Sequence, residues 1–420
     1  MLKKIGFNYI SIYLVTIFTF VNGILVARYY GPEGKGLLAT YFFIPSAIIL
    51  YLEFGINESI VHYISSNYRI PKRFLFRAFS ITIILSLIIL FIYAFNFNRE
   101  FWDLGVLGPF TLILLFSNQL LDSYLKGRLK LNILSINNLL KAALFLFTVA
   151  VAINYNFSVS HILEGYIIVL ILSLLHLSFR AIFLDFDKSR PTIQEKEIIS
   201  FGFKSYLFKV LSSSESIFDK LIVVTILSYS AFGEYSVSVG LSGLCYMIIV
   251  SPISKIFLPI LNKFEEHEKV FIAIVLSKTT FLIILFLGIL IINFSDNLVK
   301  LLYGNEFKNA STALAILMFG VIFKSPLPFL THFYKSISKP EVLVKISLIS
   351  LPINIIGSVV LIPLMGIKGA AIVSSVTYSL YSFLLVYKFM SHTNTSLLEL
   401  LSFNVKDLRS VTKSLKLTIK

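Results

Sequence analysis

The chain has 420 residues, of which 57% are hydrophobic and only 14% are charged. These polar residues are too few to coat a water-soluble globule of this length, which excludes a soluble enzyme and indicates a membrane protein. In a soluble protein the formal net charge of +15 would suggest a nucleic-acid partner, but in a membrane protein a basic excess can follow from topology. The single cysteine, Cys245, excludes an intramolecular disulfide and a cysteine-based metal site.

Uncharged runs recur along the chain, and they have the length that an α-helix needs to cross a bilayer, roughly 20 residues. They do not alternate apolar with polar residues, which excludes a membrane β-barrel. The predicted fold is an all-α integral membrane protein with about 12 transmembrane helices. In chain order these helices are expected over residues 5–27, 37–64, 76–95, 104–125, 134–153, 161–179, 199–228, 235–261, 271–294, 310–334, 342–361 and 369–390. The seventh run contains several charges and the tenth two prolines, so eleven helices is the alternative.

The longest connection between predicted helices lies midway along the chain, is charged and contains Pro191. Such a segment is typical of a linker. We predict an N-terminal six-helix lobe over residues 1–184, a cytoplasmic linker over 185–198, a C-terminal six-helix lobe over 199–391 and a basic cytoplasmic tail over 392–420. Two lobes around a central substrate cavity are a normal transporter plan.

Lysine and arginine gather in the loops on the side of the N-terminus. The opposite loops hold only Arg28, Lys35, Arg99, Lys300, Lys308 and Lys368. Short loops rich in positive charge face the cytoplasm. We therefore predict a multi-pass membrane protein with both termini in the cytoplasm. The same asymmetry explains most of the basic charge without any nucleic acid.

Catalytic and cofactor motifs are not found in the sequence. The segment Gly31–Gly36 reads GPEGKG, but it lacks the Gly-Lys-Ser/Thr ending of a phosphate-binding loop. The six histidines are scattered, and the i, i+4 pair of Glu58 and His62 supplies too few ligands for a metal site. We expect a protein that is not an enzyme and that binds no cofactor and no metal.

Seven lysines fall inside the predicted spans. A lysine that faces lipid at a helix centre costs about 2.5 to 3.5 kcal/mol, so each should face protein, water or an anion. Those closest to the cytoplasmic helix ends can extend to the interface instead. The seven are Lys141, Lys204, Lys209, Lys220, Lys255, Lys278 and Lys324.

The seventh predicted helix carries a polar stripe, because Lys209, Ser213, Ser216 and Lys220 follow the spacing i, i+4, i+7, i+11. The two lysines are about 16 Å apart along the helix axis, so an anion could meet them in succession. Pairing of the lysines with buried acids is the alternative, and the sequence leaves both open. The intramembrane acids are Glu53, Glu58, Asp122, Glu164, Glu215 and Asp219.

Several segments look similar to one family of transporters. In the first half they are ILVARYYGPEGKGLLATYFF and LEFGINESIVHYIS. In the second half they are IFDKLIVVTILSYSAFGEYSVS, LLYGNEFKNA and KPEVLVKISLISLPINIIGSVVLIPLMGIKGAAIVSSVTYSL. They resemble the polysaccharide exporters, or Wzx-type O-antigen flippases, of the multidrug/oligosaccharidyl-lipid/polysaccharide superfamily, and together they cover most of the chain.

The resemblance implies two bundles of six helices around a central cavity that opens alternately to each side of the membrane. It also implies export of undecaprenyl-diphosphate-linked sugar repeat units, such as those of O-antigen lipopolysaccharide, without catalysis. The family's turn arginine falls on Arg28 and its seventh-helix aspartate on Asp219. The implied partners are the lipid-linked oligosaccharide, the bilayer, a polysaccharide polymerase and a chain-length regulator.

These arguments give two sets of candidate site residues. The substrate-binding candidates are Lys209, Lys220, Lys324, Lys255, Lys141, Ser213, Ser216 and Arg28. The ion-coupling candidates are Glu215, Asp219 and Glu53. Glu215 and Asp219 lie four residues apart on one helix, where like charges repel each other and suit proton coupling. One alternative function is a multidrug or toxin cation antiporter of the same superfamily, although deep lysines favour an anionic headgroup. A membrane polysaccharide polymerase is a more remote alternative.

Overall fold

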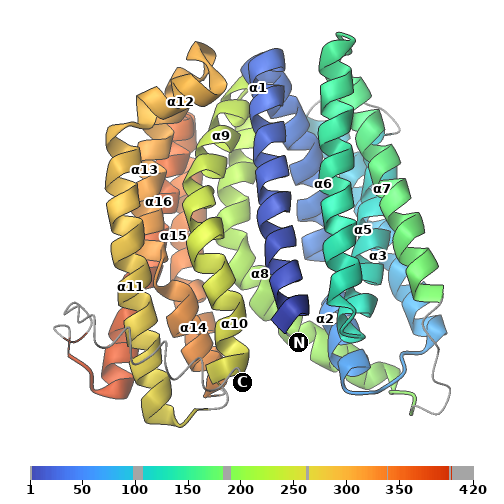
Figure 1. The fold of residues 1–420 in the computed structure, drawn as a ribbon, viewed down its shortest axis with the longest axis vertical. Helices are drawn as coiled ribbons and strands as arrows, with labels where there is room; N and C mark the ends of the chain where they lie inside the picture. The colour runs from blue at the N-terminus through green and yellow to red at the C-terminus, as the bar shows by residue number, and fades with distance from the viewer. Residues whose placement is uncertain are drawn as a thin grey trace. The chain divides into compact units, whose positions relative to one another are not determined.

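The computed structural model describes residues 2–97, 107–182, 191–261, 264–337, 339–396 and 399. Nearly all of these residues are helical (Figure 1). Within them, extended pairing is limited to an isolated bridge between Arg69 and Thr192. The predicted all-α class is therefore confirmed.

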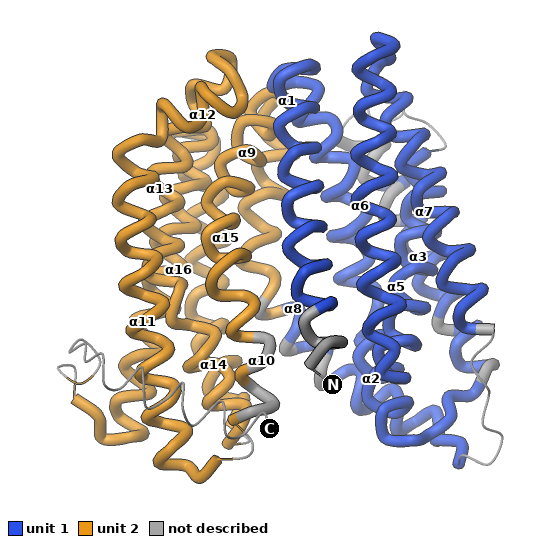
Figure 2. Tube along the Cα trace, viewed as in Figure 1, with its two compact units in different colours: residues 1–210 blue, residues 211–420 orange. Residues whose placement is uncertain are grey.

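The chain divides into two compact units, which comprise residues 1–210 and residues 211–420 (Figure 2). In the first unit, α1 packs on α6, and α5 packs on α2 and α7. A core cluster there joins Val26, Leu38 and Tyr41 of α1 to Val149 of α6 and Ile162 of α7. The helices that begin in this unit are α1 (Leu2–Leu52), α2 (Ile56–Ser65), α3 (Lys72–Phe97), α5 (Leu107–Gly127), α6 (Leu131–Asn154), α7 (Val159–Ile182) and α8 (Glu195–Ile226).

The second unit contains the end of α8 and the helices that follow it. Within this unit α16 packs on α13 and α15, and α14 packs on α10 and α11. Its helices are α9 (Tyr229–Cys245), α10 (Ser251–Leu261), α11 (Glu266–Asn293), α12 (Ser295–Tyr303), α13 (Lys308–Lys324), α14 (Leu327–Ser336), α15 (Glu341–Met365) and α16 (Ile367–Thr393).

Eight helical stretches of the described residues are long and apolar enough to cross a membrane. The first, Phe7–Leu52, has 46 residues, about 70 Å of helix, which is twice the thickness of a bilayer core. It is interrupted at Gly31, whose φ of 66° and ψ of −170° are accessible essentially to glycine alone, so it supplies two passes. The helices α3, α5 and α8, with 26, 21 and 32 residues, are long enough for three more. The described helices thus match the predicted number of spans.

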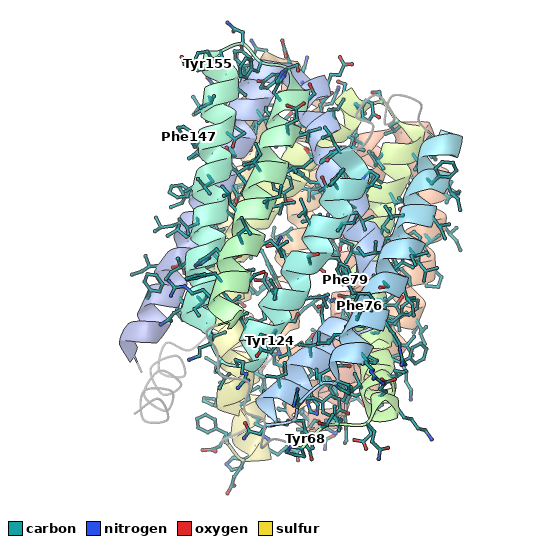
Figure 3. All side chains as sticks on the ribbon, turned by 90° about the vertical axis from the view of Figure 1, so that its right-hand side faces the viewer. Tyr68, Phe76, Phe79, Tyr124, Phe147 and Tyr155 are labelled. Carbon is teal, nitrogen blue, oxygen red and sulfur yellow. The ribbon has the colours of Figure 1, made fainter. Side chains whose placement is uncertain are left out.

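Large apolar side chains cover the outside of these helices. Phe76 of α3 and Phe147 of α6 are 73% and 67% exposed, and both project away from the first unit (Figure 3). Contiguous apolar surface of this kind is not tolerated in water but suits contact with lipid. The protein is therefore a multi-pass membrane protein.

The structure refines several predicted boundaries. The predicted eighth helix contains a π-helical turn at Tyr246–Val250. The predicted tenth helix is broken between α13 and α14, at a turn that contains Pro326, because proline has no N–H to continue a helical ladder. The nine-residue α12, which is too short to cross a membrane, lies in a segment expected to be a loop.

Part of the predicted linker is visible. The Arg69 amide donates a hydrogen bond of 2.9 Å to the Pro191 carbonyl, and the Ile193 amide donates one of 3.1 Å to the Arg69 carbonyl. The linker end is thereby fastened to the loop that follows α2. Helix α8 begins at Glu195, within the predicted linker, and passes from the first unit into the second. Residues 183–190 and 400–420, which hold the rest of the linker and most of the basic tail, lie outside the described residues, and the predicted lobe limits stay a prediction.

Candidate functional site

A close contact between two glycines sets the position of α8 in the first unit. Gly55, at the start of α2, has a φ of 71°, and a Cβ placed on it would lie 2.0 Å from the carbonyl oxygen of Gly202 in α8. The backbones of the two helices therefore touch. The Ser59 hydroxyl in α2 donates a hydrogen bond of 2.9 Å to the carbonyl of Ile198 in α8 and holds the same crossing.

This crossing brings Lys209 of α8 to the acids at the junction of α1 and α2. The Lys209 ammonium pairs with Glu53 and lies 2.8 Å from a carboxylate oxygen of Glu58. The Glu53 side chain is 1% exposed, and the Asn57 amide donates to its second oxygen. For Lys209, therefore, the structure shows the ion-pairing alternative. A role for Lys209 in substrate binding stays a prediction.

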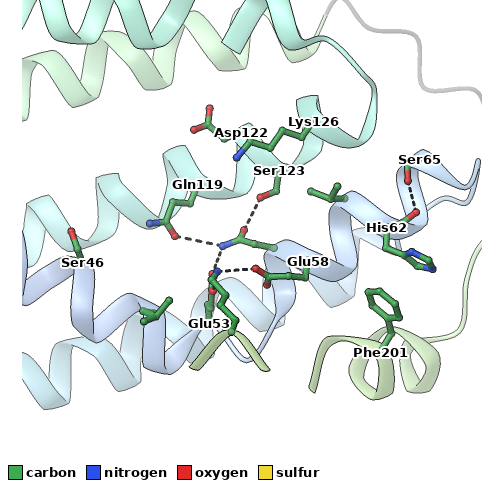
Figure 4. Close-up of a pocket in the computed structure, with 14 residues that line it drawn as sticks. Ser46, Glu53, Glu58, His62, Ser65, Gln119, Asp122, Ser123, Lys126 and Phe201 are labelled. Atoms are coloured by element: carbon green, nitrogen blue, oxygen red, sulfur yellow. Dashed lines mark hydrogen bonds and ion pairs between the residues drawn. The ribbon is translucent and has the colours of Figure 1, made fainter. Parts of the chain in front are cut away.

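Around this cluster lies a cavity of about 790 Å³, which we call the first-unit cavity (Figure 4). Its wall combines carboxylates, lysines, carboxamides and hydroxyls. The Asp122 carboxylate interacts electrostatically with Lys141 and Lys126. The lining residues are Ser46, Leu50, Glu53, Asn57, Glu58, Val61, His62, Ser65, Gln119, Asp122, Ser123, Lys126, Phe201 and Lys209.

Three uncharged residues of this wall were not among the predicted site residues. Asn57 accepts a hydrogen bond of 3.1 Å from the Ser123 hydroxyl, and its amide lies 3.5 Å from the Gln119 carbonyl oxygen. Gln119 and Ser123 are four residues apart on α5, so both project to the face that carries Asp122. That spacing is the sequence signal that could have found them.

In the second unit, two acids of α8 are buried and hydrogen-bonded. Asp219 accepts hydrogen bonds of 2.6 Å from the Tyr235 hydroxyl and 2.8 Å from the Ser374 hydroxyl, both on the same carboxylate oxygen. Glu215 accepts a hydrogen bond from Ser350 of α15. The two carboxylates therefore have different partners, although one turn of helix separates them.

A smaller cavity beside Asp219, which we call the second-unit pocket, has a volume of about 200 Å³ and contains two lysines. The ammonium of Lys324 lies 3.9 Å from the centroid of the Tyr378 ring and 6.0 Å from that of Tyr246, in cation–π geometry. Neither Lys220 nor Lys324 forms an ion pair with a carboxylate of the described residues. The pocket is lined by Ser216, Asp219, Lys220, Tyr235, Val239, Ser242, Gly243, Tyr246, Met247, Leu317, Val321, Lys324 and Tyr378.

Three of the remaining predicted site residues, Arg28, Ser213 and Lys141, line neither of these two cavities. Arg28 is exposed and lies shortly before the break in α1 at Gly31. Ser213 is partly buried, and its carbonyl accepts a hydrogen bond of 3.0 Å from the Ser216 hydroxyl. Lys141 of α6 lines neither cavity, but it interacts electrostatically with Asp122 of the first-unit cavity. The side chain of Lys255 lies outside the described residues.

Comparison with known proteins gives a family and two relatives. A family model described as polysaccharide biosynthesis protein matches residues 25–312. One relative, from Haloferax volcanii, is described as a probable low-salt glycan biosynthesis flippase, Agl15; it is 24% identical in an alignment of 391 residues that covers 88% of this chain and 80% of that protein. The capsular polysaccharide biosynthesis protein CapF of Staphylococcus aureus is 31% identical over 175 residues, or 37% of this chain and 42% of CapF.

Solved structures share the fold. The lipid II flippase MurJ, in an inward closed conformation, is 15% identical with a TM-score of 0.73, over 98% of this chain and 91% of that one. An inward-facing multidrug resistance transporter of the MATE family and MOP superfamily is 16% identical with a TM-score of 0.63, over 91% and 96%. Together with the match over residues 25–312, these findings confirm the resemblance: the chain belongs to the polysaccharide biosynthesis protein family and has the fold of the MOP superfamily transporters.

Proposed function

We propose that the protein is a flippase for undecaprenyl-diphosphate-linked sugar repeat units of O-antigen or a similar surface polysaccharide. It moves them from the cytoplasmic to the outer leaflet of the bacterial inner membrane by alternating access, with both of its termini in the cytoplasm. Membership of a polysaccharide biosynthesis family supports this proposal, as does a relative described as a glycan biosynthesis flippase. A polysaccharide polymerase and a chain-length regulator are the partners that would use the exported units.

The second-unit pocket is the observation that carries the proposal. Lys220 and Lys324 line one small cavity within the helices together with a single carboxylate, Asp219. Neither lysine forms an ion pair with a carboxylate of the described residues, although Lys324 interacts electrostatically with Glu215 and Asp219. Ammonium groups are costly inside a membrane protein, and two of them beside one lining carboxylate leave positive charge that a diphosphate would neutralise with charge-assisted hydrogen bonds. The hydroxyl of Ser216 supplies a further donor in the same pocket.

Ion coupling belongs to the same proposal. Asp219 and Glu215 of α8 and Glu53 at the end of α1 are buried carboxylates, and a proton or sodium ion exchanged at one of them would reset the empty carrier. Asp219 is also part of the second-unit pocket, so its charge acts directly beside Lys220. A change in its occupancy would alter how strongly the pocket holds an anion.

A cation antiporter is the second candidate, and the carboxylates of the first-unit cavity favour it. Glu53, Glu58 and Asp122 could accept a cationic drug. Two of these three acids already contact Lys209, which lowers the attraction that remains for a cation. The anion-binding proposal is therefore the better supported of the two.

Substitution of the pocket lysines tests the proposal in cells that lack their own copy of the gene. Lys220→Ala and Lys324→Ala should each lower surface polysaccharide export by roughly tenfold or more, since a hydrogen bond to a charged group contributes about 1.5 to 3 kcal/mol. Lys220→Arg and Lys324→Arg should restore part of it, because they keep the charge. The matched control is Lys300→Ala, at an exposed lysine of α12.

Protein abundance must be equal across the series. Wild-type export from both alanine variants would assign these lysines to packing and remove the main support for the proposal. Loss of resistance to cationic drugs, with unchanged polysaccharide export, would favour the antiporter instead.

A further inference from the structure

Three carboxylates and two lysines line the first-unit cavity, whereas one carboxylate and two lysines line the second-unit pocket. The carboxylates of the first-unit cavity are matched by lysines, since Glu53 and Glu58 contact Lys209 and since Lys126 and Lys141 interact electrostatically with Asp122. A wall of nearly balanced charge does not concentrate an anion or a cation strongly. The cavity therefore suits a polar ligand, or part of a ligand, that carries no net charge.

Hydrogen-bonding groups are left over on this wall. One carboxylate oxygen of Asp122 and one of Glu58 are buried and accept no hydrogen bond from the described residues. Buried acceptors without donors are unfavourable, and a ligand rich in O–H groups would satisfy them without adding charge. The hydroxyls of Ser46 and Ser65 and the carboxamide of Gln119 add donors and acceptors that can bind the same ligand.

The cavity also offers an apolar plane and sufficient space. The rings of His62 and Phe201 stack with their centroids 4.0 Å apart and their planes 16° apart, and both line the cavity (Figure 4). Sugar rings carry a C–H face that packs on such surfaces, while their hydroxyls bind at the rim. A volume of about 790 Å³ lies in the range of pockets that enclose a small-molecule ligand and exceeds the need of a diphosphate alone.

We propose that the first-unit cavity is the glycan subsite, which binds neutral sugar residues of the lipid-linked substrate through the hydroxyls of those sugars. This inference rests on the proposed flippase function and assigns Gln119 and Asp122 as residues that determine glycan specificity. The cavity extends to Ser65 and Lys126, in the last turns of α2 and α5. The loops that follow these two helices are among the loops rich in lysine and arginine that are predicted to face the cytoplasm. A glycan would thus be recognised on the side of the membrane where it is made.

A comparison of two lipid substrates tests the glycan subsite in reconstituted vesicles. One is the complete lipid-linked repeat unit isolated from the producing strain, and the other is the same lipid carrying only its first sugar. Gln119→Ala and Asp122→Asn should each lower the transport efficiency for the complete unit by about fivefold, the worth of one hydrogen bond. The monosaccharide lipid should be moved by the variants within twofold of the wild-type rate. Gln194→Ala, at an exposed glutamine before α8, is the matched control.

Each outcome decides between distinct accounts. Equal losses of transport for both substrates would overturn the glycan subsite and indicate a general effect on the transport cycle. A variant whose only defect is that an ion gradient no longer changes its transport rate would overturn the glycan subsite as well. Wild-type rates for both substrates in both variants would also overturn it. Failure of the wild-type protein to move either lipid would instead reject the proposed function itself.

Discussion

Lys209 is bonded to two carboxylates, and one of them, Glu53, has only 1% of its side chain exposed. Removing the ammonium would leave the Glu53 charge buried with Asn57 as its remaining described partner. Loss of one member of a buried pair is strongly destabilising, and the partial exposure of Lys209 reduces the effect. Lys209 therefore contributes to stability whatever its part in transport.

We predict that Lys209→Ala lowers the free energy of unfolding by about 2 kcal/mol, measured by thermal melting in detergent. Replacement of both partners, Lys209→Met with Glu53→Gln, should recover at least half of that loss, because no uncompensated charge stays buried. A melting temperature of Lys209→Ala equal to that of the wild type would show that the pair adds nothing to stability.

At this scale the sequence indicated which residues are unusual but not how they combine. The lysines and acids were recognisable because charge within an apolar run needs a partner. The pairing of Lys209 with Glu53 could not be recognised from the sequence, because 156 residues separate them and only the crossing of α2 and α8 brings them together. Gln119 was missed because uncharged polar residues are common in membrane helices, where they bond neighbouring helices.

Among the elements, the crossing of α2 and α8 depends on the absence of a side chain at Gly55. A methyl group there would lie 2.0 Å from the backbone carbonyl oxygen of Gly202, and backbone atoms cannot move aside like the end of a side chain. The φ of 71° at Gly55 adds strain for any other residue. The two effects act on the same junction that positions Lys209.

We predict that Gly55→Ala destabilises the protein by about 2 to 4 kcal/mol and lowers its abundance in the membrane. Gly240→Ala in α9 is the control, because nothing lies within 4 Å of the position of its Cβ; it should be neutral or slightly stabilising. Thermal melting and membrane abundance measure both variants. Equal behaviour of the two would mean that the crossing tolerates separation.

Hydropathy was sufficient to locate the helices, because each bilayer crossing requires a long apolar run. It could not locate the breaks within them. The turn at Pro326 between α13 and α14 and the bend at Gly31 involve one or two residues each, and they scarcely change the hydropathy of a long window. The short helix α12 is outside the reach of hydropathy for a different reason, namely that it does not span the membrane.

For the whole molecule, the account assigns different chemistry to two cavities, each considered within its own unit. The second-unit pocket holds Lys220 and Lys324 beside the single lining carboxylate of Asp219, with no ion pair to either lysine among the described residues, and is proposed to bind the diphosphate. The first-unit cavity, with balanced charge, is proposed to bind the glycan. The sequence indicated a division into two lobes from the charged linker near Pro191, but not which lobe carries which chemistry, since that depends on ion pairs formed only in the fold.

Flipping of the lipid-linked repeat unit by the purified protein, in vesicles without ATP, measures the proposed transport itself. A lipid diphosphate carries about two negative charges, and the membrane potential contributes up to roughly 2.3 kcal/mol per charge per 100 mV to their movement. This contribution is smaller if the positive charges of Lys220 and Lys324 move with the diphosphate. We expect transport without ATP that is faster when the starting side is negative. The double variant Lys220→Ala with Lys324→Ala should abolish most of this transport. A requirement for added ATP, or a rate indifferent to both voltage and ion gradients, would contradict this proposal.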